Sequence, residues 1–317
     1  MKIKKILIAN RGEIAIRILR ACTELTIDTV AIYTYEDRYS QHRYKADESY
    51  QIGADNQPLK PYLDSVEIIN LAKSKNVDAI HPGYGFLSEN ASFARKCAEN
   101  GIVFIGPAPE VMDALGDKIT AKQIAVKSHV PIIESNTKKL TSLKVALSEA
   151  ETIGYPLMLK AASGGGGRGM RILRTYKDLE HNFDSARNES LNAFGDDTMF
   201  LEKYVENPKH IEVQIVADNY GAIRHLFERD CSVQRRYQKV VELAPSFGLP
   251  EHVKKDIYKY AIAIAKEVNY NNIGTVEFLL DKEHKIYFIE VNPRIQVEHT
   301  VTEMITGIDL VKTQIFV

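Results

Sequence analysis

The sequence predicts an α/β protein with an N-terminal parallel α/β domain over residues 1–115 and a second, largely antiparallel domain over residues 116–317. Two observations predict this division. Short apolar runs alternate with helical patterns in the first part, as they do in parallel sheets flanked by helices. In the second part, four consecutive glycines interrupt a hairpin, and the later apolar runs have strand length with one long helix among them. The glycine-containing stretch predicts a smaller unit at about 131–204.

In the first domain, apolar spacing separates helices from strands. Between Gly12 and Leu25 the apolar residues recur at helical spacing, whereas 6–9 is a short continuous apolar run typical of a buried strand. Gly101 and the Gly106-Pro107 pair end later elements. The predicted strands are 6–9, 29–33, 79–80 and 103–105, and the predicted helices are 12–25, 66–75 and 92–100.

The second domain begins near Asp117 with a helix that stops before Pro131, because a residue that precedes proline tends to leave the helical region. The run 155–162 leads into the glycines and a strand returns at 171–173, which predicts a hairpin. A last helix opens at 307–309 and has no cap or breaker, so we expect a chain shortened at this end. The other predicted elements are a helix ending near 194, strands at 199–202, 211–217, 222–228, 274–281 and 286–291, and a helix at 251–268.

Composition and charge exclude several classes of protein. The chain has 317 residues and a net charge of −1, which argues against a general nucleic-acid surface. Its three cysteines are far apart, so neither a disulfide framework nor a zinc site is expected. No apolar run reaches the length of a membrane span, and the N-terminal run is too short for a signal peptide. We therefore expect a cytoplasmic protein with no membrane or nucleic-acid partner.

Two carboxylates occur in apolar strands, where burial is costly unless a cation neutralises them. Glu277 lies in the run 274–280 and Glu290 directly follows the run 286–289. Strand alternation places Asn292 on the same side as Glu290. Their oxygens are the hard ligands that Mg²⁺ takes when it bridges nucleotide phosphates. Together they predict a metal–nucleotide site, and a polar strand edge followed by a charged loop is the alternative.

The glycine segment 163–170 is the second feature that indicates phosphate binding. Glycines let a backbone approach phosphates closely and point several N–H groups at them. Lys160 precedes the segment and Arg168 lies within it. The segment is not a P-loop, because no Lys-Ser or Lys-Thr pair follows, and the turn at 10–13 lacks the glycines of a dinucleotide site. We favour a hairpin lid over a nucleotide, with a flexible surface loop as the alternative.

Basic residues at 228–239 form a third feature. This segment follows a strand, contains three arginines and ends at Lys239, so it is able to hold a small anion by charge-assisted hydrogen bonds. A salt-bridged surface loop is the alternative, and for this segment alone it is the more common outcome. His210 and Glu212 alternate onto one face of a strand, where a lone histidine is usually structural.

These motifs together resemble the biotin carboxylases of the ATP-grasp superfamily, and the resemblance covers the whole chain. Within that family, residues 35–48 and 292–294 are most similar to the N-terminal part of pyruvate carboxylases, with the free-standing subunit of acetyl-CoA carboxylases as the alternative. The matching stretches are 10–15, 81–90, 116–118, 163–170, 202–204, 228–232 and 294–299.

The resemblance implies a pre-ATP-grasp domain followed by an ATP-grasp domain with a glycine-loop lid, and it implies roles for single residues. Glu298 would be the base, and Arg294 and Lys239 the other catalytic residues. Mg²⁺ or Mn²⁺ would be held by Glu277, Glu290 and Asn292. Bicarbonate would be held by Lys239, Arg294, Gln296, Val297 and Glu298. ATP would be held by Lys118, Lys160, Gly166, Gly167, Met170, Glu202, Lys203, Tyr204, Val205, His210, Gln234, Tyr237, Glu277 and Glu290.

The reaction that the resemblance implies is ATP-dependent carboxylation of biotin. Bicarbonate, deprotonated by Glu298, would attack the γ-phosphate of ATP to give carboxyphosphate, and its CO₂ would pass to biotin on a carrier domain outside this chain. The resemblance also implies a homo-oligomer. Two departures are visible: the family usually has histidine where Tyr237 stands, and its biotin-contacting arginine lies in a domain beyond residue 317.

Two other functions remain open from the sequence. One is an ATP-grasp ligase of the carbamoyl-phosphate or peptide type, which would share the ATP and Mg²⁺ residues, although the spacing of Arg294, Gln296 and Glu298 argues against it. The other is a non-catalytic ATP-binding or dimerisation module.

Overall fold

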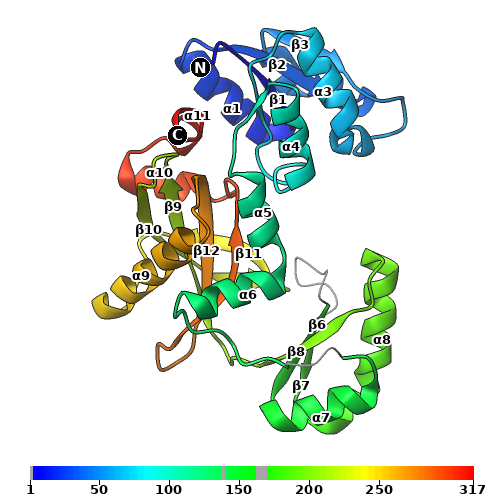
Figure 1. The fold of residues 1–317 in the computed structure, drawn as a ribbon, viewed down its shortest axis with the longest axis vertical. Helices are drawn as coiled ribbons and strands as arrows, with labels where there is room; N and C mark the ends of the chain where they lie inside the picture. The colour runs from blue at the N-terminus through cyan, green and yellow to red at the C-terminus, as the bar shows by residue number, and fades with distance from the viewer. Residues whose placement is uncertain (1–2, 137–139, 162–169) are drawn as a thin grey trace.

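The computed structural model describes residues 3–136, 140–161 and 170–317. Figure 1 shows three groups of elements along the long axis: an N-terminal α/β part at one end, a central sheet with its helices, and a small unit at the other end. Each group contains its own sheet, with five, five and three strands respectively. The first sheet is parallel and the other two are antiparallel, as the sequence predicted.

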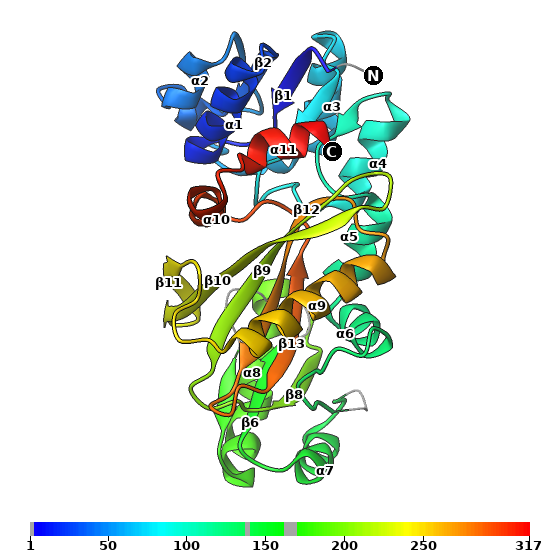
Figure 2. The ribbon, with the colours of Figure 1, turned by 90° about the vertical axis from the view of Figure 1, so that its left-hand side faces the viewer.

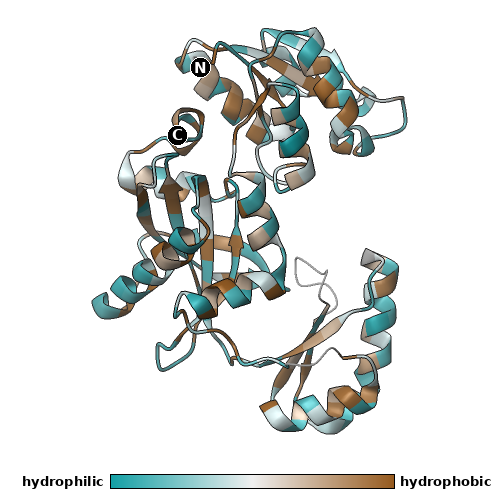
Figure 3. Cartoon of the chain, viewed as in Figure 1, coloured by the Kyte–Doolittle hydropathy of each residue, from teal (hydrophilic) through white to brown (hydrophobic). Residues whose placement is uncertain are grey.

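The N-terminal sheet has the strand order β3-β2-β1-β4-β5. Along β1, Ile6 and Ile8 join one buried cluster and Leu7 joins another, so both faces of the sheet are covered. Figure 3 shows the correspondingly apolar colouring of these strands. The strands are β1 (Lys5–Ile8), β2 (Asp28–Tyr33), β3 (Glu48–Gln51), β4 (Ala79–His81) and β5 (Val103–Phe104). The helices are α1 (Gly12–Glu24), α2 (Gln41–Lys45), α3 (Ser65–Ser74) and α4 (Ala91–Glu99), with 3₁₀ turns at Tyr35–Asp37 and Lys60–Leu63.

The central sheet has the order β11-β10-β9-β12-β13. One face packs against three helices, because strand alternation sends Ile211, Val213 and Ile215 of β9 into a shared apolar cluster. The polar residues that alternate with them, His210, Glu212 and Gln214, therefore point to the opposite face. The strands are β9 (Lys209–Ala217), β10 (Ile223–Arg235), β11 (Gln238–Leu243), β12 (Asn272–Leu280) and β13 (Ile286–Asn292). The helices are α5 (Pro109–Gly116), α6 (Lys118–Lys127) and α9 (Glu251–Glu267).

The small unit has its own apolar cluster between a three-stranded sheet and two helices. Its sheet has the order β7-β6-β8, with β6 (Leu157–Ala161), β7 (Arg171–Leu173) and β8 (Met199–Lys203). Its helices are α7 (Leu143–Ile153) and α8 (Tyr176–Phe194). A capping box between Thr175 and Asp178 begins α8, and Gly195, in the left-handed region, ends it. At the junction with the central sheet, the Phe288 amide donates to the carbonyl of Pro131 at 2.8 Å.

The last two helices, α10 (His299–Thr306) and α11 (Leu310–Phe316), return the chain to the N-terminal part, as Figure 2 shows. Leu310 and Val311 enter the buried cluster that contains the apolar face of α1. Arg17 of α1 forms ion pairs with Glu303 at 2.9 Å and with Asp309 at 2.7 Å. The N-terminal sheet and the central sheet are thus joined through packing as well as through the chain. No helix among the described residues is both long and apolar enough to cross a membrane.

The strands and helices predicted from the sequence are present in the described residues, with ends that differ by a few positions. The surface loop considered for 228–239 is wrong over 228–235, because β10 continues to Arg235 and a further strand, β11, follows. The turn between them is formed by Arg236 and Tyr237, with φ values of 51° and 65°, and contains none of the glycine or asparagine that signals such turns. The other unpredicted elements are β3, α2, α5, α7 and α10.

Candidate active site

A row of ionisable side chains crosses the polar face of the central sheet. The strand register pairs Arg229 on β10 with Glu212 on β9. It pairs Glu212 in turn with Glu277 on β12, and Glu277 with Glu290 on β13. Residues directly opposite each other in antiparallel strands point to the same face. The register therefore brings one guanidinium and three carboxylates into a single line across four strands.

Lys239 supplies a cation next to this row. Its Nζ lies 2.8 Å from Glu277 Oε1 and 2.8 Å from Glu298 Oε1, and it forms a third ion pair with Glu212. The three carboxylates are almost completely buried, whereas the lysine side chain is 20% exposed. Removing charges from water is costly, and the shared ammonium offsets part of that cost for all three carboxylates.

The charges of this cluster shift the pKa of each member. Burial opposes the charged form of Lys239, but the surrounding carboxylates outweigh it and raise the lysine pKa. Burial also opposes ionisation of Glu298, and the Lys239 charge outweighs it and lowers the pKa of this carboxyl. For Glu277, burial is outweighed by the hydrogen bond with His210 and the charge of Lys239, so its pKa is lowered. Glu277 and Glu298 are therefore ionised at neutral pH.

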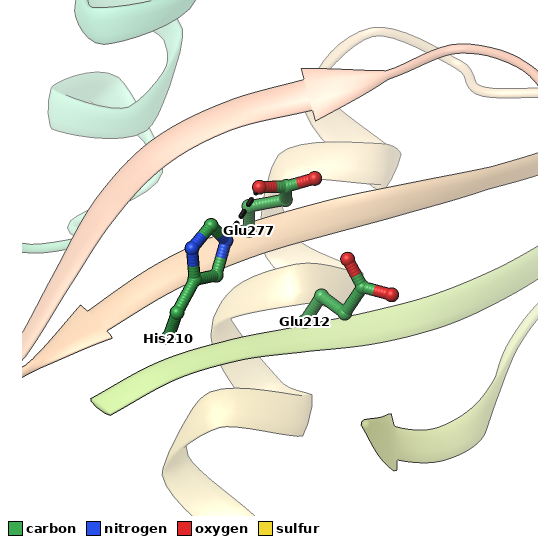
Figure 4. Close-up of side chains that lie close together, drawn as sticks. All are labelled: His210, Glu212 and Glu277. Carbon is green, nitrogen blue, oxygen red and sulfur yellow. Dashed lines mark hydrogen bonds and ion pairs between the residues drawn. The ribbon is translucent and has the colours of Figure 1, made fainter. Parts of the chain in front are cut away.

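His210 extends the cluster along β9. Its Nε2 lies 2.6 Å from Glu277 Oε2, and its Nδ1 lies 2.8 Å from Gln234 Nε2. Figure 4 shows His210 and Glu212 on β9 and Glu277 on β12, with their side chains directed toward one another. One ligand atom from each of these three lies within 4.8 Å of the others. Both carboxylates of this group also pair with Lys239, so the cation that they hold in this structure is the lysine ammonium.

Glu290 and Asn292 add oxygen atoms on the neighbouring strand β13. Asn292 Nδ2 donates to Glu277 Oε1 at 2.8 Å. Burial and the charge of Glu277 raise the pKa of Glu290, and Lys118 offsets this only in part. Glu290 thus lacks a full counter-charge, and two adjacent carboxylates together with an amide oxygen form the donor set that Mg²⁺ prefers. The three predicted metal ligands therefore share one face of adjacent strands, and their chemistry fits the ion.

Arg294 links the central sheet to the N-terminal part. Its guanidinium forms an ion pair with Glu89 and donates to Asn292 Oδ1 at 3.1 Å and to Gln296 Oε1 at 3.2 Å. Gln296 is buried, whereas Val297 is 61% exposed. An arginine held by several acceptors in this way keeps its planar donors in one orientation.

The residues predicted to hold bicarbonate lie next to one another. Glu298 is the N-cap residue of α10, so its position depends on where that helix begins. It contacts Lys239, and Arg294 contacts Gln296, with Val297 between them in the chain. Gln296 Nε2 also donates to Glu277, the partner of Lys239, so two cations, an amide side chain and a carboxylate are linked by direct contacts, and their chemistry suits a small anion that must also lose a proton.

Glu202 is the centre of a second cluster, where the small unit meets the central domain. It is buried near the end of β8 and pairs with Lys160 on β6 and with Lys122 on α6. Burial opposes its ionisation, but the two ammonium groups outweigh it and lower the pKa of Glu202. Lys160 and Glu202 were predicted from the sequence and Lys122 was not. The Glu202 carboxylate joins the small unit to the central domain because its two partners belong to different units.

The remaining residues predicted to bind ATP differ in their burial and in their contacts. Lys118 begins α6, and burial lowers its pKa despite the charge of Glu290. Lys203 Nζ donates to the carbonyls of Gly154 at 2.9 Å and Tyr155 at 3.1 Å, so its side chain is engaged within the small unit.

Tyr237 lies exposed in the turn between β10 and β11. Met170, Tyr204 and Val205 are half-buried, and Gly166 and Gly167 lie outside the described residues. The roles of these residues remain predictions.

Sequence reasoning did not assign a role to several members of these clusters: Arg229, Glu212, Lys122 and Glu89. The pairing of Arg229 with Glu212 follows from register, and register depends on an irregularity in β10 between His225 and Glu228. No turn residue marks that irregularity in the sequence. Alternation did place Glu212 on the face of His210, which was the available signal for it.

Comparison with known families identifies the class of protein. Residues 2–112 match the family described as biotin carboxylase, N-terminal domain, and residues 117–317 match the carbamoyl-phosphate synthase L chain, ATP binding domain. Among solved structures, the biotin carboxylase domain of a 2-oxoglutarate carboxylase from Hydrogenobacter thermophilus is 50% identical, with a TM-score of 0.95. The match covers 99% of this chain and 69% of that one. The chain belongs to the biotin carboxylase family.

Two further relatives refine the comparison. Pyruvate carboxylase from Staphylococcus aureus is 57% identical over 316 residues, which cover 100% of this chain. This chain spans 27% of the length of that relative. A biotin carboxylase–β-γ-ATP complex from Campylobacter jejuni is 46% identical, with a TM-score of 0.95, and the match covers 99% of this chain and 70% of that one. The Hydrogenobacter structure is described as a dimer in complex with MgADP, ADP and bicarbonate.

Proposed function

We propose that this chain binds MgATP and bicarbonate, forms carboxyphosphate and supplies the carboxyl group to biotin, as the biotin carboxylase part of a pyruvate carboxylase. The observation that carries the proposal is Lys239, held between Glu212, Glu277 and Glu298 beside the polar face of the central sheet. Glu277 belongs to the proposed metal ligands and Glu298 is the proposed base. One lysine therefore connects the proposed metal–ATP site to the proposed bicarbonate site.

ATP is proposed to lie between the central sheet and the small unit. Lys118 and Lys160 approach this region from α6 and β6, and the ion pairs of Lys160 and Lys122 with Glu202 hold cations at the junction. Cations at this place offer charge-assisted hydrogen bonds to phosphates. The small unit, about 131–204, is proposed to act as a lid that excludes water during phosphoryl transfer.

Mg²⁺, or Mn²⁺ in its place, is proposed to bind Glu277, Glu290 and Asn292. When bound there, the ion neutralises charge on the phosphates during transfer. The residues contribute hard oxygen atoms from two neighbouring strands, and Glu290 has the raised pKa of a carboxyl that lacks a full counter-charge. His210 and Lys239, which flank Glu277, hold that carboxylate ionised.

Bicarbonate is proposed to bind against Lys239, Arg294, Gln296 and the Val297 amide. Glu298 removes its proton, and the freed oxygen attacks the γ-phosphate of ATP, which forms the new P–O bond as ADP leaves. Lys239 keeps Glu298 ionised before the anion arrives. Carboxyphosphate then releases CO₂, and its phosphate takes the proton of the biotin ureido nitrogen. Arg294 stabilises the negative charge that develops there.

The partners follow from the same proposal. Biotin is expected to arrive on a carrier domain, and pyruvate is proposed as the final acceptor because pyruvate carboxylases are among the chain's relatives at 52–57% identity. A homo-oligomer is proposed because the Hydrogenobacter relative is described as a domain dimer. An acyl-CoA acceptor is the alternative that carboxylation assays with pyruvate and acetyl-CoA distinguish.

The proposal is tested by measuring phosphate release from ATP with and without bicarbonate, and then with free biotin. We expect release that requires bicarbonate. Binding of MgATP without bicarbonate-dependent cleavage would instead identify a non-catalytic module. Formation of carbamoyl phosphate when ammonia is added would identify a ligase of the other ATP-grasp type.

A further inference from the structure

Arg229 is the most completely buried cation of the central sheet, with no exposed surface in its side chain. Its guanidinium makes four hydrogen bonds to side chains on three different elements. The donations go to Glu212 Oε1 at 2.5 Å and Gln214 Oε1 at 2.9 Å on β9, to Thr275 Oγ1 at 3.2 Å on β12, and to Thr302 Oγ1 at 2.7 Å on α10. A guanidinium has five N–H donors in a rigid plane, so these contacts fix its orientation.

The contact with Thr302 bears on the position of Glu298. Glu298 is the N-cap residue of α10, and Thr302 lies four residues further along the same helix. Residues four apart lie above one another on one helical face. The bond from Arg229 to Thr302 therefore fixes how the first turn of α10 is rotated about the helix axis. It thereby fixes the direction in which the Glu298 side chain points.

A second path runs from Arg229 to the same carboxylate through side chains. Glu212 accepts from Arg229 through Oε1 and pairs with Lys239 through Oε2. Lys239 in turn lies 2.8 Å from Glu298 Oε1. Arg229 thus fixes Glu212, Glu212 fixes Lys239, and Lys239 holds the Glu298 side chain.

We propose that Arg229 is the positioning residue for Glu298, which it holds from two sides, through Thr302 on α10 and through Glu212 and Lys239. Arg229 does not touch the proposed bicarbonate site and acts only through these neighbours. The inference rests on the proposed function, since Glu298 has the role of base only there.

The sharpest test changes Thr302 rather than Arg229, because Thr302→Val removes one hydroxyl, keeps the shape of the side chain and leaves the buried guanidinium with three partners. We expect the kcat of bicarbonate-dependent ATP cleavage to fall roughly tenfold to a hundredfold, because small misplacements of a catalytic group have effects of this size. The KM for MgATP is expected to stay unchanged, since the nucleotide residues are not moved. Thr302→Ser, which keeps the hydroxyl, is expected to restore the rate.

Thr300→Val, at an exposed position of the same helix, is the matched control and is expected to have the wild-type rate. An unchanged kcat in Thr302→Val, or an equal loss in Thr300→Val, overturns the proposal. Arg229→Lys is a second variant, expected to lower kcat in the same way because a lysine cannot reproduce the four-point contact.

A measurement that does not depend on activity separates this inference from the proposed function. Amide hydrogen exchange over α10 is expected to rise in Thr302→Val while exchange over α11 is unchanged. If the wild-type protein shows no bicarbonate-dependent cleavage, the proposed function fails, and the exchange data still decide whether Arg229 fixes α10. Unchanged exchange over α10 overturns the positioning role.

Discussion

Lys239 Nζ lies 2.8 Å from Glu298 Oε1, so the carboxylate proposed as the base is already paired with a partly buried cation. The same ammonium pairs with Glu212 and Glu277. An incoming anion must therefore compete with three carboxylates for Lys239. When the lysine pairs with the anion, its ion pair with Glu298 becomes weaker. Under the proposed function, this arrangement would couple the binding of bicarbonate to the release of Glu298 as the base.

The dependence of three carboxylates on Lys239 predicts a large effect of its removal. Lys239→Met is expected to lower the free energy of unfolding by about 3–5 kcal/mol at neutral pH, because buried carboxylates are left without their shared cation. In the variant the carboxyl pKa values rise above those of the unfolded chain, so the folded state binds protons more tightly. The deficit is therefore expected to grow as the pH rises.

Urea unfolding at about pH 5 and about pH 8, on either side of the range in which a raised carboxyl pKa falls, measures this change. Lys255→Met, at an exposed position of α9, is the control and is expected to have little effect. In the unmodified protein the sign is opposite: the lowered pKa of Glu277 and Glu298 gives stability that is present at neutral pH and lost as the pH falls. A deficit in Lys239→Met that is equal at both pH values contradicts the shared-cation interpretation.

The second prediction concerns ATP binding. Lys160→Ala is expected to weaken MgATP binding about ten- to hundredfold, because a charge-assisted contact with phosphate contributes about 1.5–3 kcal/mol. The fold is expected to persist, since Lys122 still neutralises Glu202. Calorimetric titration with MgATP measures the affinity. Lys177→Ala, an exposed lysine of the same unit, serves as the comparison, and equal affinities in the two variants count against the assignment.

The sequence was sufficient for the fold class because period-two and helical spacing are local properties of the chain. It also indicated Glu277, Glu290 and Asn292 as candidate metal ligands, because polar residues in apolar strands are unusual. It did not lead to Arg229 or Lys122. Their partners lie 17 and 80 residues away, and those contacts depend on register and on the packing of α6 against the small unit. The strand that carries Lys239 was missed because the turn before it uses Arg236 and Tyr237 in left-handed conformations.

The third prediction concerns the small unit, which has an apolar cluster of its own and joins the central domain near Pro131 and Lys203. If this unit closes over the nucleotide, MgATP is expected to slow hydrogen exchange in β6 and β7 and in residues 162–169 between them, which lie outside the described residues. Exchange over β1 and β2 in the N-terminal sheet is the internal reference. Identical exchange with and without MgATP rules out closure.

The last prediction separates nucleotide binding from chemistry at Glu298. Glu298→Gln keeps the size of the side chain and its position at the start of α10, but an amide is unable to accept the proton of bicarbonate. MgATP affinity is expected to stay the same, while bicarbonate-dependent ATP cleavage is lost. Isothermal titration and phosphate release, measured on the same preparation, check both halves. Glu283→Gln, a change of the same kind on an exposed residue, controls for the loss of one charge. If Glu298→Gln cleaves ATP at the wild-type rate with bicarbonate, then Glu298 is not the base, and Lys239 holds it for a structural reason alone.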